Sequence, residues 1–123
     1  LQVRRFLWLS GFRYLLNDRR LPGRPDLVLP KWRTVVFVNG CFWHAHQGCA
    51  LFKLPQTNSA FWVQKLSKNR ERDEDNTHEL IGLGWRVAII WECSLRRESG
   101  KSRKLLSLTR FIKAVRGPSR REF

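Results

Sequence analysis

The most informative ten residues of this chain, dense in metal-ligating and aromatic side chains, are Gly40-Cys41-Phe42-Trp43-His44-Ala45-His46-Gln47-Gly48-Cys49. They hold two thiols and two imidazoles, and the only other cysteine of the sequence is Cys93, far downstream. Three thiolates and one imidazole make up the tetrahedral Cys₃His set that Zn²⁺ prefers in a structural site. His46 lies between the two cysteines of this segment. The pattern therefore predicts a zinc site that joins two distant stretches of chain.

Two other interpretations of the cysteines stay open. Free cysteine is often a small buried hydrophobe, and burial alone would explain Cys93 in the apolar run that begins at Trp85. Burial explains less for Cys41 and Cys49, which lie among Gly, His and Gln. A disulfide would leave one of three cysteines unpaired, and no secretory signal is visible.

The chain is strongly basic, with 24 Lys and Arg against 10 Asp and Glu and a net charge of +14 in 123 residues. Such a surplus favours a polyanionic partner. Six tryptophans favour nucleic acid over an anionic membrane, because indole rings stack on bases as well as pack in cores. No apolar run approaches the roughly 20 residues that span a bilayer. The composition predicts a soluble protein of a reducing, intracellular compartment, with no membrane partner.

The chain starts at Leu1 and contains no methionine, so we expect a fragment without its natural N-terminus. Its length predicts one domain over residues 1–123, large enough to bury a core. The polar tail from Gly117 is expected to be flexible.

Hydrophobic periodicity predicts both helices and strands. Amphipathic patterns indicate a helix that ends near residue 10, a long helix over 56–83 and a terminal helix over 105–115, after a basic linker over 96–104. Short apolar runs predict strands at 12–16, 26–29, 34–38 and 85–91, and the run 34–38 favours a central position with both faces covered. This order indicates an α/β fold, a mixed central sheet flanked by helices.

Two carboxylates and a histidine are candidates for catalysis. Asp26 opens a strand, and the next strand runs through Val38 to the His/Cys segment. One carboxylate, a strand carbonyl and phosphate oxygens suit Mg²⁺, although Asp also often occupies turns. The imidazole that zinc leaves free is a competent general base near neutral pH. Asp73 on the long helix could hydrogen-bond it, although its run of charged neighbours is also typical of a solvated face.

Aromatic residues beside the cysteines admit two interpretations. Phe42 and Trp43, with Trp62 on the long helix, could be apolar wedges that enter a base stack, at a cost of a few kcal/mol per step. Core packing explains such rings equally well. Lys65 and Asn69 share the helix face of Trp62.

Taken in order, these motifs resemble the very-short-patch-repair (Vsr) DNA mismatch endonucleases from Val3 to about Arg96. The residues that carry the resemblance are Leu21-Pro22-Gly23-Arg24-Pro25-Asp26, Val38-Asn39-Gly40-Cys41-Phe42-Trp43-His44, Phe61-Trp62, Lys68-Asn69, Arg72-Asp73, Gly84-Trp85-Arg86-Val87 and Trp91-Glu92-Cys93.

The resemblance implies a restriction-endonuclease-like fold with a structural zinc. It implies a Mg²⁺-dependent hydrolase that nicks one strand of duplex DNA beside a thymine mispaired with guanine. Asp26 would bind Mg²⁺ together with the Val38 carbonyl, His44 would be the general base and Asp73 would support it. The zinc ligands implied are Cys41, His46, Cys49 and Cys93, the wedges are Phe42, Trp43 and Trp62, and Lys65 and Asn69 are further candidates for DNA contact.

The chain departs from the family pattern in three places. Val38 and Asn39 stand where the best-known members have threonine and histidine, Gly48 is an extra residue, and a family glutamate would fall just before Leu1. Rival hypotheses are a homing or restriction-type nuclease of the same fold and a non-catalytic, zinc-stabilised DNA-binding module. The expected partners are mismatched double-stranded DNA and mismatch-repair proteins, for a monomer at the nucleoid of the bacterial cytoplasm.

Overall fold

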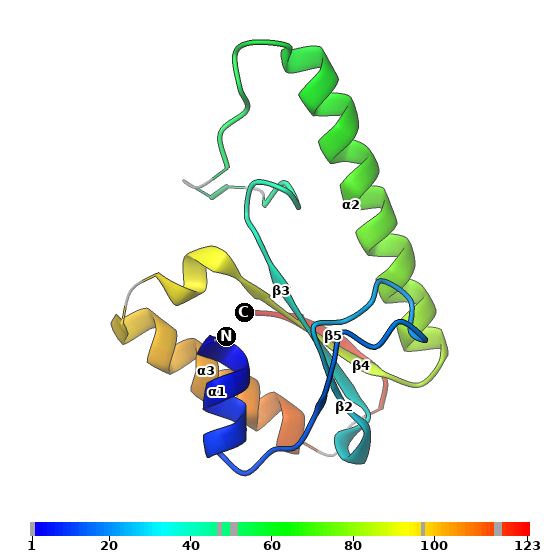
Figure 1. The fold of residues 1–123 in the computed structure, drawn as a ribbon, viewed down its shortest axis with the longest axis vertical. Coiled ribbons are helices and arrows are strands. Elements are labelled where there is room, and N and C mark those ends of the chain that lie inside the picture. Colours follow the sequence, from blue (N-terminus) through cyan, green and yellow to red (C-terminus); the bar gives the residue numbers. More distant parts are fainter. Residues whose placement is uncertain (1, 47, 50–51, 97, 115–116) are drawn as a thin grey trace.

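The structure is a computed structural model that describes residues 2–46, 48–49, 52–96, 98–114 and 117–123 (Figure 1). Its elements follow the order α1 (Gln2–Leu9), β1 (Leu15–Leu16), β2 (Leu27–Leu29), η1 (Pro30–Trp32), β3 (Thr34–Asn39), α2 (Ser59–Gly82), β4 (Arg86–Trp91), η2 (Glu92–Leu95), α3 (Glu98–Lys113) and β5 (Arg120–Glu122), where η1 and η2 are short 3₁₀ turns. No helix in the described ranges is long and apolar enough to cross a membrane.

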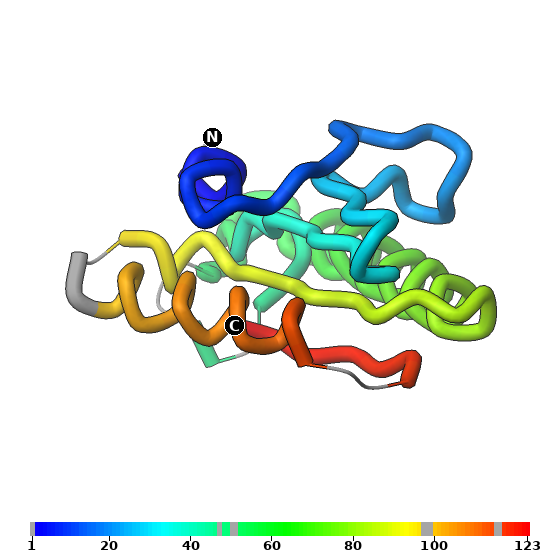
Figure 2. The backbone as a smooth tube through the Cα atoms, turned by 90° about the horizontal axis from the view of Figure 1, so that it is seen from below, coloured from blue at the N-terminus to red at the C-terminus, as the bar shows by residue number. Residues whose placement is uncertain are grey.

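The strands form one mixed sheet in the order β1-β2-β3-β4-β5. β1, β2 and β3 pair antiparallel, whereas β3, β4 and β5 run parallel, with α2 and α3 as the crossovers. Figure 2 shows the C-terminal β5 beside β4, at the edge opposite to β1. The expected mixed sheet flanked by helices is confirmed, and so is the central position of β3.

Side chains of the central strands alternate between two hydrophobic cores, because successive residues of a strand point to opposite faces. Val36 and Ile90 pack with residues of α1 and α3 on one face. Val35 and Val87 pack with Leu80 of α2 on the other face, next to Cys41. Figure 1 shows α1 and α3 together on one side of the sheet and α2 on the other.

The long helix α2 has two unequal halves. Leu66, Thr77 and Leu80 are its buried residues, and its N-terminal half extends beyond the sheet in Figure 1. The C-terminal half is therefore anchored in the core, while most side chains of the first turns lie at the surface.

Two expectations about the C-terminal part were wrong. The basic segment expected to be a linker forms the first turns of α3, which starts at Glu98. Residues 98–104 are polar apart from one glycine and carry no apolar periodicity, although a helix can extend cooperatively from its packed turns. Val115, expected inside this helix, lies outside the described residues.

The tail expected to be flexible from Gly117 instead contains β5, which pairs with β4. Phe123 is buried, and Arg120 forms an ion pair with Glu74 of α2 at 2.7 Å. Polar side chains are common on edge strands, so they hid this one from the sequence pattern.

Candidate active site and metal centre

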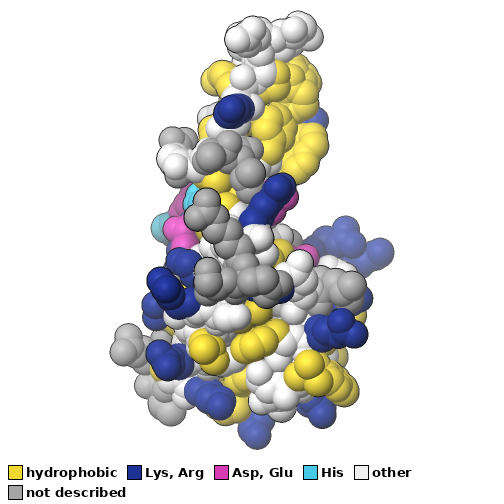
Figure 3. Space-filling view, turned by 90° about the vertical axis from the view of Figure 1, so that its left-hand side faces the viewer, with side chains coloured by type: hydrophobic (Ala, Val, Ile, Leu, Met, Phe, Trp, Pro, Cys, Tyr) yellow, Lys and Arg dark blue, Asp and Glu magenta, His cyan; other side chains and the backbone are white. Residues whose placement is uncertain are grey.

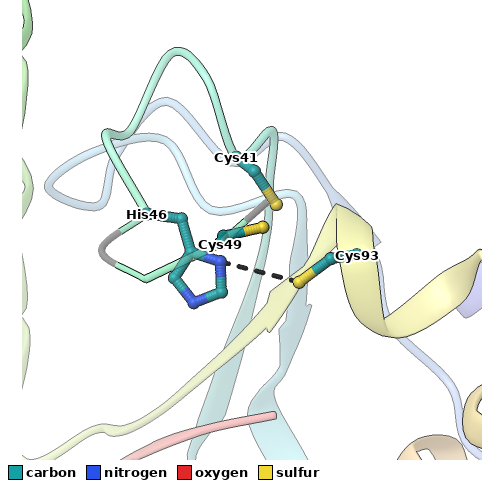
Figure 4. A group of neighbouring side chains, drawn as sticks. All are labelled: Cys41, His46, Cys49 and Cys93. Carbon is teal, nitrogen blue, oxygen red and sulfur yellow. Dashed lines mark hydrogen bonds between the residues drawn. The ribbon is translucent and has the colours of Figure 1, made fainter. Parts of the chain in front are cut away.

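A cluster of metal-ligating side chains forms where β3 and β4 end. The two strands are parallel neighbours, with Asn39 in register with Trp91, so the segments that follow them leave the sheet at the same edge. Cys41, His46 and Cys49 come from the loop after β3, and Cys93 comes from η2. Their ligand atoms lie within 4.8 Å of one another, and Figure 4 shows them pointing toward one another.

The spacing inside this cluster fits a tetrahedral ion. His46 Nδ1 lies 3.6 Å from Cys93 Sγ. Metal–sulfur and metal–nitrogen bonds of about 2.3 and 2.0–2.1 Å put tetrahedral neighbours at a similar separation. The His46 ring also stacks on Trp91, with centroids 3.9 Å apart and planes 4° from parallel. The ring is therefore held in place by the sheet, and the donor set fits a bound metal.

Burial shapes the electrostatics of the thiols. It raises the pKa of Cys41 to about 12 and also raises the pKa of Cys93, because a buried thiolate loses its hydration. Metal ligation requires thiolates, whose negative charge a cation would compensate.

The second histidine of the loop faces α2 instead of the thiols. His44 Nδ1 lies 2.5 Å from Asp73 Oδ2, and the two side chains are 30% and 35% exposed. Thr77 Oγ1 donates to the carbonyl of Asp73. An imidazole that donates from Nδ1 to a carboxylate has its lone pair on Nε2, so His44 can accept a proton there.

Asp26 and Val38 meet on the other side of the end of β3. Val38 N donates to Asp26 Oδ2 at 2.7 Å. Extending the register Leu27↔Val36 by two residues sets Pro25 opposite Val38. A hydrogen-bonded antiparallel pair exchanges both N–H and C=O, but proline has no N–H to donate. Because the N–H and C=O of one strand residue point to the same side, the Val38 carbonyl faces the side where its N–H meets the Asp26 carboxylate.

The candidate catalytic residues form two groups around β3. Asp26 and Val38 line one cavity of about 280 Å³. His44 and Asp73 line another of about 480 Å³, together with Asn39. Neither of these two cavities is lined by both Asp26 and His44. Val38 and Asn39 are consecutive in β3, so their side chains face opposite sides of the sheet at the end of this strand.

The predicted wedge residues form an exposed aromatic cluster. Phe42 lies 5.2 Å from Trp43 and 5.5 Å from Trp62, between ring centroids, and Trp43 and Trp62 are 6.0 Å apart. Trp43 is 52% exposed, which disfavours the core interpretation for this ring. Lys65 Nζ lies 5.8 Å from the Trp62 centroid and 6.0 Å from that of Trp43.

Two further aromatics of this cluster were not predicted from the sequence to join the wedge residues. Phe61 is 56% exposed and lies 5.3 Å from the Trp62 centroid, and Phe52 lies 6.3 Å from that of Phe42. The position of Phe61 four residues before Lys65 places both on one helix face, a signal that could have found it. Phe52 lies in an irregular segment where periodicity gives no signal.

The surface around this cluster has a clear division. Figure 3 shows hydrophobic side chains gathered on the upper part of the molecule, where Figure 1 places the first turns of α2. Lys and Arg side chains surround the lower body. An apolar projection next to a cationic body suits a ligand that has both stacked rings and phosphates.

Asn69 has a partner within the protein. Its Nδ2 donates to the backbone carbonyl of Trp43 at 3.2 Å. The DNA contact expected for Asn69 stays a prediction.

Comparisons with known proteins agree with these features. The family described as DNA mismatch endonuclease Vsr matches residues 1–51. The chain is 46% identical to the type II nicking enzyme V.NmeAIP of Neisseria meningitidis over 111 residues, 90% of this chain and 79% of that protein. It is 45% identical to the type II nicking enzyme V.XorIIP of Xanthomonas oryzae over 93 residues, 76% of this chain and 68% of that protein.

A third relative is the DNA mismatch endonuclease Vsr of Escherichia coli, with 51% identity over 87 residues. That match covers 71% of this chain and 55% of that protein, so the chain spans about half of it. Similarity of this extent, over more than two thirds of both nicking enzymes, confirms the resemblance seen in the sequence motifs: the chain belongs to the Vsr family of DNA mismatch endonucleases.

Proposed function

We propose that this protein is a DNA mismatch endonuclease that nicks one strand of a duplex beside a thymine mispaired with guanine. The observation that carries the proposal is the pairing of His44 with Asp73 at the end of β3, where Asp26 and Val38 also meet. Membership of the Vsr family supports DNA as the substrate.

The base for the reaction is His44. Asp73 accepts its Nδ1–H and fixes the ring, so Nε2 takes the proton from the water that attacks the scissile phosphorus. The P–O bond to the leaving deoxyribose oxygen breaks as the water adds, and that oxygen is protonated from solvent. General-base catalysis of this kind contributes about 10²–10⁴-fold to a rate. Asp73 lies on the turn of α2 before the buried Thr77, so the ring is held against an anchored part of the helix.

Asp26 and the carbonyl of Val38 are the residues that would hold Mg²⁺. Their chemistry fits the ion, because a carboxylate and a strand carbonyl converge on one side of β3. The carbonyl is free of a backbone partner on β2, since Pro25 stands opposite Val38 and has no N–H. When bound, Mg²⁺ supplies Lewis-acid stabilisation of charge on the phosphoryl oxygens. Because any β-strand residue offers a carbonyl, the valine found in place of threonine at this position is compatible with the site.

The cluster of Cys41, His46, Cys49 and Cys93 would hold a structural zinc. Four protein ligands close the coordination sphere, so this metal has a structural and not a catalytic role. It would brace the loop that carries Phe42, Trp43 and His44.

Recognition of the mispair would come from the exposed aromatic rings. A mispaired step costs less to unstack than a paired step, so insertion of Phe42, Trp43 and Trp62 favours mismatched DNA. Lys65 and the basic surface would contribute phosphate contacts and, with them, strong salt dependence.

The remaining expectations are proposals of the same kind. The five-stranded mixed sheet with helices on both faces supports a restriction-endonuclease-like fold in a single domain. We infer a monomer that acts at the nucleoid in the bacterial cytoplasm, with mismatch-repair proteins as partners, from the activity proposed.

The test is strand nicking of labelled duplexes that differ by one G:T or G:C pair. With Mg²⁺, the protein should nick the G:T duplex faster, on one strand only, and EDTA should abolish nicking. Cleavage of both duplexes at equal rates would favour a nuclease with another target. Tight binding without nicking, at any Mg²⁺ concentration, would favour the non-catalytic DNA-binding module.

A further inference from the structure

Two residues one helical turn apart on α2 hold two consecutive residues of the loop. Asn69 Nδ2 donates to the carbonyl of Trp43 at 3.2 Å, and Asp73 accepts from the His44 ring at 2.5 Å. Residues i and i+4 of a helix share a face, so one face of α2 contacts both the backbone of Trp43 and the side chain of His44.

The bond from Asn69 bears directly on the peptide that precedes His44. The carbonyl of Trp43 and the N–H of His44 belong to one planar unit. Asn69 holds the carbonyl end, and His44 N donates to the carbonyl of Gly40 at 3.2 Å. Both polar ends of this plane are therefore fixed, which sets the direction in which the His44 side chain leaves the backbone.

The part of α2 next to this peptide is anchored in the hydrophobic core. Asp73 lies between the buried Leu66 and Thr77 of α2, and the Thr77 hydroxyl bonds the carbonyl of Asp73. Asn69 itself is only partly buried, in the half of the helix that extends beyond the sheet. Its amide is thus a link between the anchored helix and the exposed aromatic cluster.

We propose that Asn69 is a positioning residue that keeps Trp43 and His44 in a fixed relation. When Trp43 inserts into the DNA, the His44 imidazole is then placed for its role as general base. This inference rests on the proposed function and deepens it. Without the Asn69 amide, Trp43 can still stack on a base, but the Trp43–His44 peptide can rotate. Misplacement of a catalytic group by about 1 Å can cost about 10²-fold in rate. Because Asp73 still holds the ring, we expect about a tenfold loss.

The test compares Asn69→Ala and Asn69→Leu with Gln64→Ala, an exposed amide on the same helix that lines a different groove with Val63. Alanine and leucine are strong helix formers, so these variants should fold. The measurements are the single-turnover nicking rate at saturating G:T duplex, and Kd for G:T and G:C duplexes by anisotropy. Both Asn69 variants should lose about tenfold in the saturated rate, with Gln64→Ala unchanged, and any DNA contact of Asn69 is measured separately by the Kd ratio.

Three results would overturn this inference. A fall in the Kd ratio by more than about threefold at an unchanged saturated rate would assign Asn69 to reading DNA alone. An unchanged saturated rate would show that the amide does not position His44. A recovered rate in Asn69→Leu would show that packing matters and not donation.

The inference can fail separately from the proposed function. If the wild-type protein does not nick, the proposed function fails, and NMR of the DNA-free protein still tests the link. Asn69→Ala should shift the backbone amide and ring signals of His44, whereas unchanged signals would overturn the positioning role.

Discussion

Side chains from one short loop serve two very different environments. Cys41 and His46 turn toward the cysteine cluster and connect the ends of β3 and β4. Trp43 and His44, which lie between them in sequence, face α2 through one hydrogen bond each. The first set belongs to a cluster of four side chains that could ligate one metal ion, and the second is held by single side-chain contacts. Changes in the ligand set should therefore affect folding, and changes in the second set should affect activity with little loss of stability.

Loss of the metal should have the largest effect. Cys93→Ser removes the ligand that connects η2 to the loop, and structural zinc binding contributes roughly 10 kcal/mol or more in small domains. The variant should unfold or lose most of its thermal stability, as seen by circular dichroism. The wild type should contain one zinc per chain by elemental analysis. A wild type that keeps its full thermal stability after the metal is removed would contradict the structural role of the site.

A pH series on the metal-free protein tests the burial of the thiols. Burial raises the pKa of Cys41 from its ordinary 9.0 to about 12 in the folded chain. The folded state then keeps a proton that the unfolded state loses, so the metal-free fold should lose stability as pH rises from about 9 to about 12. Zinc-bound protein should lack this loss, since its thiols are already deprotonated. Equal denaturation midpoints in the metal-free protein at pH 8.5 and 10.5 would contradict the assigned burial.

Substitutions in the catalytic group should have the next largest effect, and on rate alone. His44→Ala should lower nicking by about 10²–10⁴-fold, and Asp26→Ala should abolish it. Both should keep DNA affinity within about tenfold, because phosphate contacts from Lys and Arg supply most of the binding. Single-turnover nicking, anisotropy and zinc content are the measurements. If His44→Ala instead expels zinc, the two histidines are assigned the wrong way round.

The features that were predicted best from the sequence are those marked by residue types close together in the chain. Alternation in the apolar runs indicated the central strands, and the density of soft ligands around Cys41 indicated a metal cluster. Helix position raised the partnership of Asp73 with a free imidazole only as one of two interpretations, because Asp73 lies within a run of charges. The path of α2 across the sheet brings the two together, and the family resemblance favoured this interpretation over a solvated charge.

The features missed have little local signal. The first turns of α3 and the strand β5 are polar, so they carry none of the periodicity that marked the other elements. β5 exists because β4 offers an edge and Phe123 fills a gap in the core. Only a tertiary structure shows either cause.

Removal of the wedge should change recognition more than catalysis. Replacing Phe42, Trp43 and Trp62 together by Ala should remove most of the difference in affinity between G:T and G:C duplexes. Each stacked base is worth about 1–3 kcal/mol by alanine substitution. Salt-sensitive binding by the +14 surface should persist. Anisotropy at two salt concentrations measures both quantities, and undiminished discrimination would show that these rings only pack with one another.

The smallest effect that we expect is that of Phe61→Ala. Phe61 lies at the outer side of the aromatic cluster, 56% exposed, next to Trp62. If it adds one peripheral contact to DNA, its loss should cost about 1 kcal/mol, or about fivefold in Kd. Thermal stability should stay the same, since alanine favours helix and the ring buries little area. Val63→Ala is the matched control, because Val63 is 52% exposed on the same turn but lines a different groove. Equal losses in both variants would assign the effect to general apolar contact, and no loss for Phe61→Ala would confine the wedge to the three rings already named.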